Sequence, residues 1–301
     1  MTRQVIAGVD ESRESRAAAV WAACEASRRE VPPRLLHVRA WCTPVSSGAS
    51  ESASRRPVAL RVLRAAEQYV RAACPGVRVA SEQAEGPGSR ALLSAAEEAA
   101  VLVLGFRGLS ALTGFVLGSV ARAVVARASC PVVLVRVGRA PDDRWRYDAR
   151  RAGVPRAGGR DVVLGLDLND PCDEVIDFAF DAARLRNTGV RVVSAWRAPS
   201  VLSLGPGEVG LIDGPQWSEE RRGFQSAVLC TWRDKYPTVA VTGDIVEGRA
   251  SPPLVRAAAE ACLLVVGRRT REEPYVGTRT GPVTHAVSRH ARCPVAVVPH
   301  S

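Results

Sequence analysis

A glycine-rich stretch in the first half of the chain carries the spacing that best fits ligand chemistry. Gly105 ends the apolar run 101–104, Gly108 follows it, and Gly118-Ser119 precede a segment of helical period, giving the pattern G-x2-G-x9-G-S. Glycines permit tight turns and let backbone N–H groups approach an anion closely. The first N–H groups of a helix lack intrahelical partners, and the helix dipole favours negative charge there. The pattern therefore predicts a phosphate site, with Ser119 as helix cap and hydroxyl donor; an ordinary glycine-rich turn is the alternative.

The elements expected around this loop place it where open α/β sheets bind ligands. Residues 101–104 and 132–135 are apolar and fit strands, and residues 120–128 between them fit a helix. Strand, loop, helix and strand in this order form a βαβ unit whose loop follows the carboxyl end of the first strand. The spacing matches neither the dinucleotide fingerprint nor the Walker loop, because no lysine follows the glycines.

The segment before the loop shows the same alternation of strands and helices. Residues 5–9 fit a strand that ends at Asp10, and Ser12 is a suitable N-cap for a helix over 15–29. Further strands are expected at 34–40 and 77–83, a loop at 44–57, and helices at 58–73 and 89–99. Strands that alternate with helices predict a parallel, doubly wound sheet. Asp10 then lies at a strand's carboxyl end, where it can contact a ligand or cap the helix through an Asx-type bond.

The pattern restarts after residue 160, which reveals an internal repeat. Residues 162–167 repeat 5–10, residues 191–196 and 239–246 repeat the second and third strands, and residues 292–295 repeat 129–132. Residues 138–159 are polar and charged and contain proline and glycine, as linkers do. We therefore predict two tandem doubly wound, Rossmann-like α/β domains at 1–137 and 160–301, joined by a linker at 138–159.

The equivalent loop of the second domain lacks several features of the first. Gly267 matches Gly105, but Thr270 replaces Gly108 and Pro282 replaces Ser119. Proline has neither an N–H group nor a hydroxyl, so two donors at the helix start are lost together. The loop also contains two glutamates and four arginines: Glu272, Glu273, Arg268, Arg269, Arg271 and Arg279. The sequence favours a degenerate second site over one in which these arginines compensate as anion ligands.

The glycine pattern after an apolar strand, with Cys130-Pro131-Val132 before the last strand, resembles the ATP-binding signature of the universal stress protein family. The opening stretch VIAGVDESRESRAAAVWAACEA is similar to that family's first strand, strand-end Asp and first helix. The likeness occurs twice and covers nearly the whole chain. It implies an adenine nucleotide α-hydrolase-like fold with a five-stranded parallel sheet in each domain, flanked by helices. It also implies dimers through the last strand and adenine nucleotide binding, although some members lack the signature and bind no ATP.

The resemblance further implies which residues hold ATP, alone or with Mg²⁺. Asp10 would contact the ribose or adenine region, and the backbone of Val38 would meet adenine. The residues that would hold the phosphates are Gly105, Gly108, Gly118 and Ser119, with Val120 N–H and Arg107 as further donors. A solvated loop charge is the alternative for Arg107. Glu11 stands where the family usually has glycine, and its carboxylate would repel a phosphate unless it points away or helps hold Mg²⁺.

Composition narrows the remaining classes of function. The net charge of +10 comes mostly from arginines spread among alanines, and aromatic residues are only 5%, so a nucleic-acid platform is not favoured. The eight cysteines form neither a CxxC pair nor a Cys/His zinc spacing, so we expect free buried thiols and no metal site. We find no base–nucleophile pair and assign no catalytic residue. Because no signal peptide and no spanning apolar run of about 18 residues is evident, we expect a cytoplasmic protein without membrane contact.

The expected function is a stress-response module that binds ATP in the first domain and changes its protein partner with nucleotide occupancy. Two alternatives are open: an interaction or scaffold protein that binds no nucleotide, and a slow ATPase with little to position a water. The sequence does not identify the protein partner. We expect the domains to pack as an internal pseudo-dimer, strand 132–135 against 295–298, which would pair two otherwise exposed edges. A further homodimer of whole chains is compatible with this arrangement.

Overall fold

The structure, a computed structural model, describes residues 3–39, 50–106, 118–137, 160–197, 214–270 and 280–301. The first half contains β1 (Gln4–Gly8), α1 (Arg13–Arg28), β2 (Pro33–Arg39), α2 (Ser50–Ala73), β3 (Ala80–Glu85), α3 (Gly88–Glu98), β4 (Ala99–Gly105), α4 (Ser119–Arg127) and β5 (Val132–Val135). The second half contains β6 (Val162–Gly165), α6 (Asp173–Arg186), β7 (Val190–Trp196), α7 (Gly214–Lys235), β8 (Val241–Glu247), α8 (Ser251–Ala257), β9 (Leu263–Arg269), α9 (Pro282–His290) and β10 (Val295–His300). The predicted tandem, doubly wound α/β fold is confirmed.

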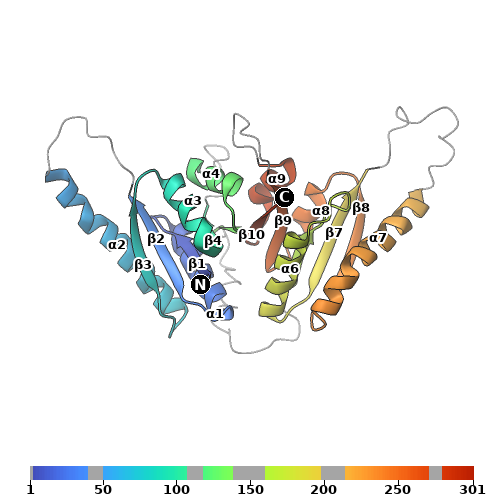
Figure 1. Cartoon of the computed structure of the whole chain (residues 1–301), viewed down its shortest axis with the longest axis horizontal. Coiled ribbons are helices and arrows are strands. Elements are labelled where there is room, and N and C mark those ends of the chain that lie inside the picture. The colour runs from blue at the N-terminus through green and yellow to red at the C-terminus, as the bar shows by residue number, and fades with distance from the viewer. Residues whose placement is uncertain (1–2, 40–49, 107–117, 138–159, 198–213, 271–279) are drawn as a thin grey trace.

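One sheet runs through both halves, in the strand order β3-β2-β1-β4-β5-β10-β9-β6-β7-β8. Neighbouring strands are parallel within each half. At the junction β5 and β10 are antiparallel, with Val133 opposite Ala296. The predicted pairing of the two last strands is therefore confirmed. Figure 1 shows the halves on either side of this junction, with α2 and α7 at the two outer ends.

Helices cover both faces of the sheet, because successive side chains of a buried strand point to opposite faces. In β4, Val101 and Val103 belong to the core that includes residues of α1, α2, α6 and α7, whereas Leu102 and Leu104 belong to the core on the other face, with residues of α3, α4, α8 and α9. Each of the two resulting cores contains residues from both halves. The junction is therefore continuous with the hydrophobic core on both sides. Among the described helices, none has the length and apolar character needed to cross a membrane.

Two predicted elements of the first half are corrected. Part of the loop predicted at 44–57 is helical, because α2 begins at Ser50. The serines of this segment had suggested a loop, but a helix accommodates serine at a small cost in free energy. Residues 40–49 lie outside the described residues. The third strand begins at Ala80 rather than at Val77, whose N–H instead closes a turn on the carbonyl of Cys74. Val77 packs on the core from this turn. Its apolar side chain therefore fitted the alternating pattern of a strand although its backbone forms a turn.

A buried ion-pair network joins α1 to α6 across the junction. Glu25 of α1 is fully buried, and its carboxylate accepts hydrogen bonds from Arg186 of α6 at 2.6 Å and from Arg29 at 2.9 Å. Arg29 also donates to Asp181 of α6 at 3.0 Å. Burial alone would raise the pKa of Glu25, but the guanidinium groups of Arg186, Arg29 and Arg28 outweigh burial and hold this pKa below its usual value.

Two further arginines connect the halves, because each donates hydrogen bonds to carbonyl groups at the end of a helix in the other half. Arg136, just after β5, donates to the carbonyl of Arg289 at 2.7 Å, near the end of α9. Arg268 of β9 donates to the carbonyl of Ala126 at 3.0 Å, near the end of α4. The last carbonyls of a helix lack intrahelical partners and carry partial negative charge. Each half therefore contributes a cation to a helix end of the other half.

Removal of Arg186 should destabilise the whole chain. Arg186→Met leaves Glu25 buried with fewer partners, and we expect the free energy of unfolding in urea to fall by about 3 kcal/mol. As a matched control, Arg71→Met removes the more exposed pair between Arg71 and Glu67 on α2 and should cost less than about 0.5 kcal/mol. The double variant Glu25→Leu/Arg186→Met should recover much of the loss, because the pair is then removed as a whole and Arg29 keeps Asp181 as a partner. Equal losses for Arg186→Met and Arg71→Met would contradict this account.

The same carboxylate should shape the acid denaturation of the protein. Because the pKa of Glu25 is lower in the folded chain than in the unfolded chain, its contribution to stability is fully present above the unfolded value of about 4.3. That contribution is lost as the pH falls through the folded pKa. In Glu25→Gln we expect the unfolding free energy to fall less steeply with pH below about 4.3, measured by urea titrations at stepped pH. Superimposable acid limbs in the two proteins would argue against the predicted shift.

Candidate functional site

Three of the predicted ligand residues lie at the carboxyl ends of neighbouring strands in the first half. Asp10 follows β1, Val38 is the penultimate residue of β2, and Gly105 is the last residue of β4. β1 pairs with both β2 and β4, and the strand order reverses at this point. Open α/β sheets bind ligands at such switch points. The structure thus brings these three residues to one edge of the sheet.

Asp10 organises the turn that leads into α1. Its Oδ1 accepts the backbone N–H of Ser12 at 2.9 Å and also the hydroxyl of Ser12. The Ser12 oxygen in turn accepts the N–H of Ser15 at 3.0 Å, so the predicted N-cap is confirmed. The Asx-type arrangement considered for Asp10 is therefore present, and the residue is also exposed at the edge of the sheet.

Gly105 and Gly118, the glycines at the two ends of the loop, have different surroundings. A Cβ atom at Gly105 would lie 2.5 Å from the backbone nitrogen of Ser15 and closer still to the carbonyl of Glu14. Gly105 therefore lets the first turn of α1 pack directly on the end of β4. A Cβ atom at Gly118 would meet no atom of the described residues within 4 Å. With respect to these residues, the space in front of Gly118 is open.

Helix α4 begins at this open space. Its N-cap is Gly118, and Ser119 is already its first helical residue, so the predicted role of Ser119 as the cap is wrong. Gly118, Ser119 and Val120 are exposed, and Gly118 has no side chain to satisfy the first N–H groups. The start of α3 lies beside them, because a Cβ atom on Gly88 would be 3.6 Å from Val120. The other two predicted phosphate ligands, Arg107 and Gly108, lie outside the described residues.

The second half has a cavity of about 670 Å³ at the equivalent switch point. It is bounded by the residues after β6, the end of β7, the end of β9 and the start of α9. Among the described residues, four arginines line it, Arg197, Arg221, Arg249 and Arg269, together with apolar side chains such as Val193 and Leu254. Pro282 is the first residue of α9, so the loss of one N–H donor there is as predicted. The second half therefore has a cavity at its switch point although it lacks this donor.

A later helix start explains part of the difference between the halves. Asp167 lies 157 positions after Asp10 in the repeat, so the start of α1 at Arg13 corresponds to Asp170. Helix α6, however, begins only at Asp173. Pro171 accounts for the delay, because the residue before a proline avoids helical backbone angles. The turn that covers Gly105 in the first half is thus missing over Gly267, and the imidazole of His300 takes its place: a Cβ atom on Gly267 would be 2.9 Å from His300 Nε2.

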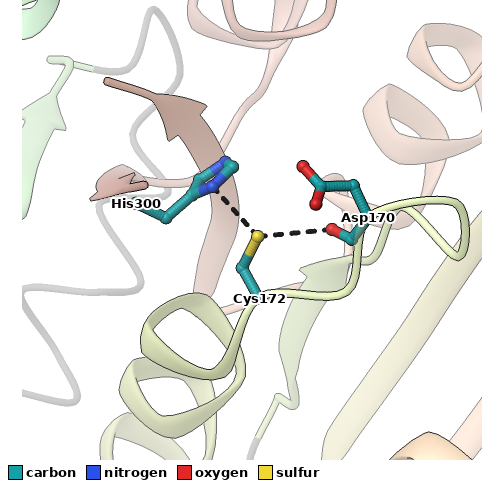
Figure 2. Close-up of side chains that lie close together, drawn as sticks. All are labelled: Asp170, Cys172 and His300. Atoms are coloured by element: carbon teal, nitrogen blue, oxygen red, sulfur yellow. Dashed lines mark hydrogen bonds between the residues drawn. The ribbon is translucent and has the colours of Figure 1, made fainter. Parts of the chain in front are cut away.

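Three polar side chains converge where this turn is missing (Figure 2). Cys172 Sγ lies 2.9 Å from Nδ1 of His300 and donates to the backbone carbonyl of Asp170 at 3.3 Å. Burial, assisted by the charges of Asp170 and Glu174, raises the pKa of the Cys172 thiol to about 11. A hydrogen bond from Arg269 holds the pKa of the Asp170 carboxyl below its usual range.

Sequence reasoning missed this cluster because Cys172 and His300 are 128 residues apart. Their only signals in the sequence are their places in the repeat. Cys172 stands at a helix start and His300 at a strand end, two positions that the fold brings to the same edge of the sheet.

Comparison with known proteins assigns the chain to a family. The model of the universal stress protein family matches residues 1–136 and 159–299. The chain belongs to the universal stress protein family. Both halves are therefore universal stress protein units, in agreement with the repeat and with the resemblance of the glycine pattern.

Relatives match the chain over nearly its whole length. A curated universal stress protein of Mycobacterium tuberculosis is 31% identical over 305 residues, which cover 99% of this chain and 97% of that protein. The crystal structure of a universal stress protein from Archaeoglobus fulgidus matches with a TM-score of 0.68 and 16% identity, covering 98% of both chains. A universal stress protein crystallised in complex with cAMP covers 45% of this chain with a TM-score of 0.36 and 24% identity.

The contrast between the two glycines of this universal stress protein can be tested by alanine substitution. Gly105→Ala forces a methyl group into the backbone of α1, and we expect it to destabilise the protein by about 1–3 kcal/mol or more. Gly118→Ala meets no neighbour among the residues that the structure describes and should change stability by less than about 0.5 kcal/mol. Thermal and urea unfolding of both variants would measure the difference. Similar stabilities for the two variants would show that α1 does not need close contact with β4.

Proposed function

We propose that this universal stress protein binds an adenine nucleotide, ATP in the first instance, at the switch point of its first half. The observation that carries the proposal is the start of α4. There Gly118, Ser119 and Val120 are exposed at the edge of the sheet, with no side-chain cap from Gly118 on the first N–H groups. Such a helix start is a favourable site for a phosphate group.

The local geometry supports phosphates at this place. Because Gly118 has no side chain and no described residue lies within 4 Å of its Cβ position, an anion can approach the N–H groups of Ser119 and Val120 closely. Ser119 does not cap the helix, so its hydroxyl is available to donate to a phosphate oxygen. Arg107 and Gly108 are proposed to complete the phosphate site from the loop.

The ribose and adenine would lie along the strand ends. Asp10 and the backbone of Val38 stand on neighbouring strands next to Gly105, and they are proposed to hold this part of the nucleotide. The exposed Glu11 adjoins Asp10, and its charge is compatible with ATP if it faces solvent or shares a Mg²⁺ ion with the phosphates. Occupancy of the site would change the surface around α4, and thereby the choice of protein partner.

The second half is proposed to be the weaker nucleotide site. Pro282 takes away one N–H group and the hydroxyl that Ser119 supplies in the first half. Hydrogen bonds to charged groups contribute about 1.5–3 kcal/mol each, so the loss of two would weaken binding by about a hundredfold or more. The arginines around the cavity offset part of this loss without restoring the directed donors at the helix start.

The first experiment is a titration of the whole chain with ATP and Mg²⁺ by calorimetry, after denaturation of a sample to quantify any nucleotide carried through purification. We expect about one high-affinity ATP per chain. Ser119→Ala should weaken ATP binding by about ten- to a hundredfold, because it removes one hydrogen bond to a charged group.

Matched glycine variants assign the site to one half. Gly118→Val should abolish tight binding, because its side chain fills the space in front of α4, whereas Gly281→Val makes the same change at the start of α9 and should leave it intact. Neither glycine has a neighbour within 4 Å of its Cβ position in the described part of the chain, so both variants should fold. Unchanged affinity in Gly118→Val would place the nucleotide elsewhere. No binding at millimolar ATP would favour an interaction protein that uses its surface alone.

A further inference from the structure

The side chains of Asp170, Cys172 and His300 form a cluster that the proposed nucleotide site does not use. A carboxylate oxygen, a sulfur and a ring nitrogen all lie within 4.8 Å of one another. Figure 2 shows the three side chains directed toward a common space, two from the turn before α6 and one from the end of β10. All three also line the cavity of the second half.

Each member of the cluster is held in place by the fold. Cys172 is the N-cap residue of α6, fixed by the turn that Asp167 and Pro171 organise. The carbonyl of His300 accepts hydrogen bonds from the backbone N–H and the hydroxyl of Thr270, both at 2.7 Å. The His300 ring rests on Gly267, which has no side chain of its own, beside the side chain of Val175.

The donor set fits a metal ion of the zinc class. Thiolate, imidazole and carboxylate together are typical ligands of Zn²⁺, and sites that use three protein ligands keep a fourth position open. Tetrahedral coordination, at about 2.3 Å to sulfur and about 2.0 Å to nitrogen, sets these two atoms roughly 3.5 Å apart. Cys172 Sγ and His300 Nδ1 are 2.9 Å apart, so a small rotation of either side chain would admit the ion.

The surroundings of the cluster suit such an ion. Arg269 binds one carboxylate oxygen of Asp170, which leaves the other oxygen for a metal and orients the group as outer-shell partners do. The open position would face the cavity of about 670 Å³, whose lining includes Arg197, Arg221 and Arg249. A metal there would present an exchangeable position to water or to an anionic ligand.

The first half provides an internal comparison. By the repeat offset of 157, Cys172 corresponds to Ser15, and His300 corresponds to Val137 because Val295 corresponds to Val132. Ser15 uses its hydroxyl to bind the carbonyl of Asp10 at 2.8 Å. The cluster therefore belongs to the second half alone in this repeat, where the delayed start of α6 makes room for it.

We propose that Asp170, Cys172 and His300 form a site for one Zn²⁺ ion, with its fourth position open to the cavity of the second half. The site is independent of the nucleotide site in the first half. It gives the second half a ligand-binding chemistry of its own.

The test uses Co²⁺ as a spectroscopic probe in the metal-free, full-length protein. Thiolate coordination should produce a sulfur-to-cobalt charge-transfer band in the near ultraviolet and tetrahedral d–d bands in the visible, saturating at about one equivalent and displaced by Zn²⁺. Cys172→Ser, which restores the residue type of the first half, should remove the charge-transfer band. His300→Gln and Asp170→Asn, on either side of the thiol, should each weaken Co²⁺ binding by about tenfold or more.

Matched controls separate this site from the other thiols and histidines. Cys230→Ser and His290→Asn change exposed residues of α7 and α9 and should leave the cobalt spectrum unchanged. Gly118→Val should bind Co²⁺ normally, which separates failure of the metal site from failure of the nucleotide site. Zn²⁺ should raise the melting temperature of the parent protein and not that of Cys172→Ser, while the two metal-free proteins melt alike. A charge-transfer band that persists in Cys172→Ser, or that disappears in Cys230→Ser, would overturn the proposal, as would its absence from the parent protein.

Discussion

The structure depends on the pairing of two apolar edge strands. β5 is four residues long and fully buried, and the residues of β10 that face it are equally apolar. An edge of this kind left open would expose both unpaired backbone groups and apolar side chains, and would favour association with other chains. The antiparallel contact between β5 and β10 satisfies the backbone of both strands within one molecule. Each half thereby supplies what the other would otherwise need from a second chain.

The charged contacts across the junction follow from this pairing. Once β5 and β10 lie side by side, α1 and α6 lie on the same face of the sheet, where their buried residues belong to one core. Glu25 is then buried against α6 and requires Arg186 as a partner. A buried ion pair of this kind adds little net stability compared with an apolar pair, but its loss is costly, so it favours one relative placement of the halves.

The sequence predicted those features that depend on local pattern and on the repeat. Alternating strands and helices gave the fold, and the equivalence of 132–135 and 295–298 gave the junction. It also predicted Ser12 as a cap, because capping involves residues close in sequence. It could not predict that Gly105 is required by the backbone of α1, or that His300 occupies the same position over Gly267, since both depend on distances between elements. The N-cap of α4 was misassigned by one residue because Gly118 and Ser119 are both acceptable caps, and only the backbone angles distinguish them.

The difference between the two halves at this edge of the sheet follows largely from Pro171. In the first half the helix after the first strand starts early and covers the glycine at the end of β4, which leaves the start of α4 as the proposed phosphate site. In the second half Pro171 delays the helix, and the uncovered glycine accepts a histidine from β10. β10 is also the strand that pairs with β5, and its last residue, His300, is held in register by pairing with Arg269 of β9. Pro282, which lacks the N–H and hydroxyl of Ser119, and the sulfur–nitrogen–oxygen cluster thus line one cavity of the second half, while the first half has its N–H groups at the start of α4.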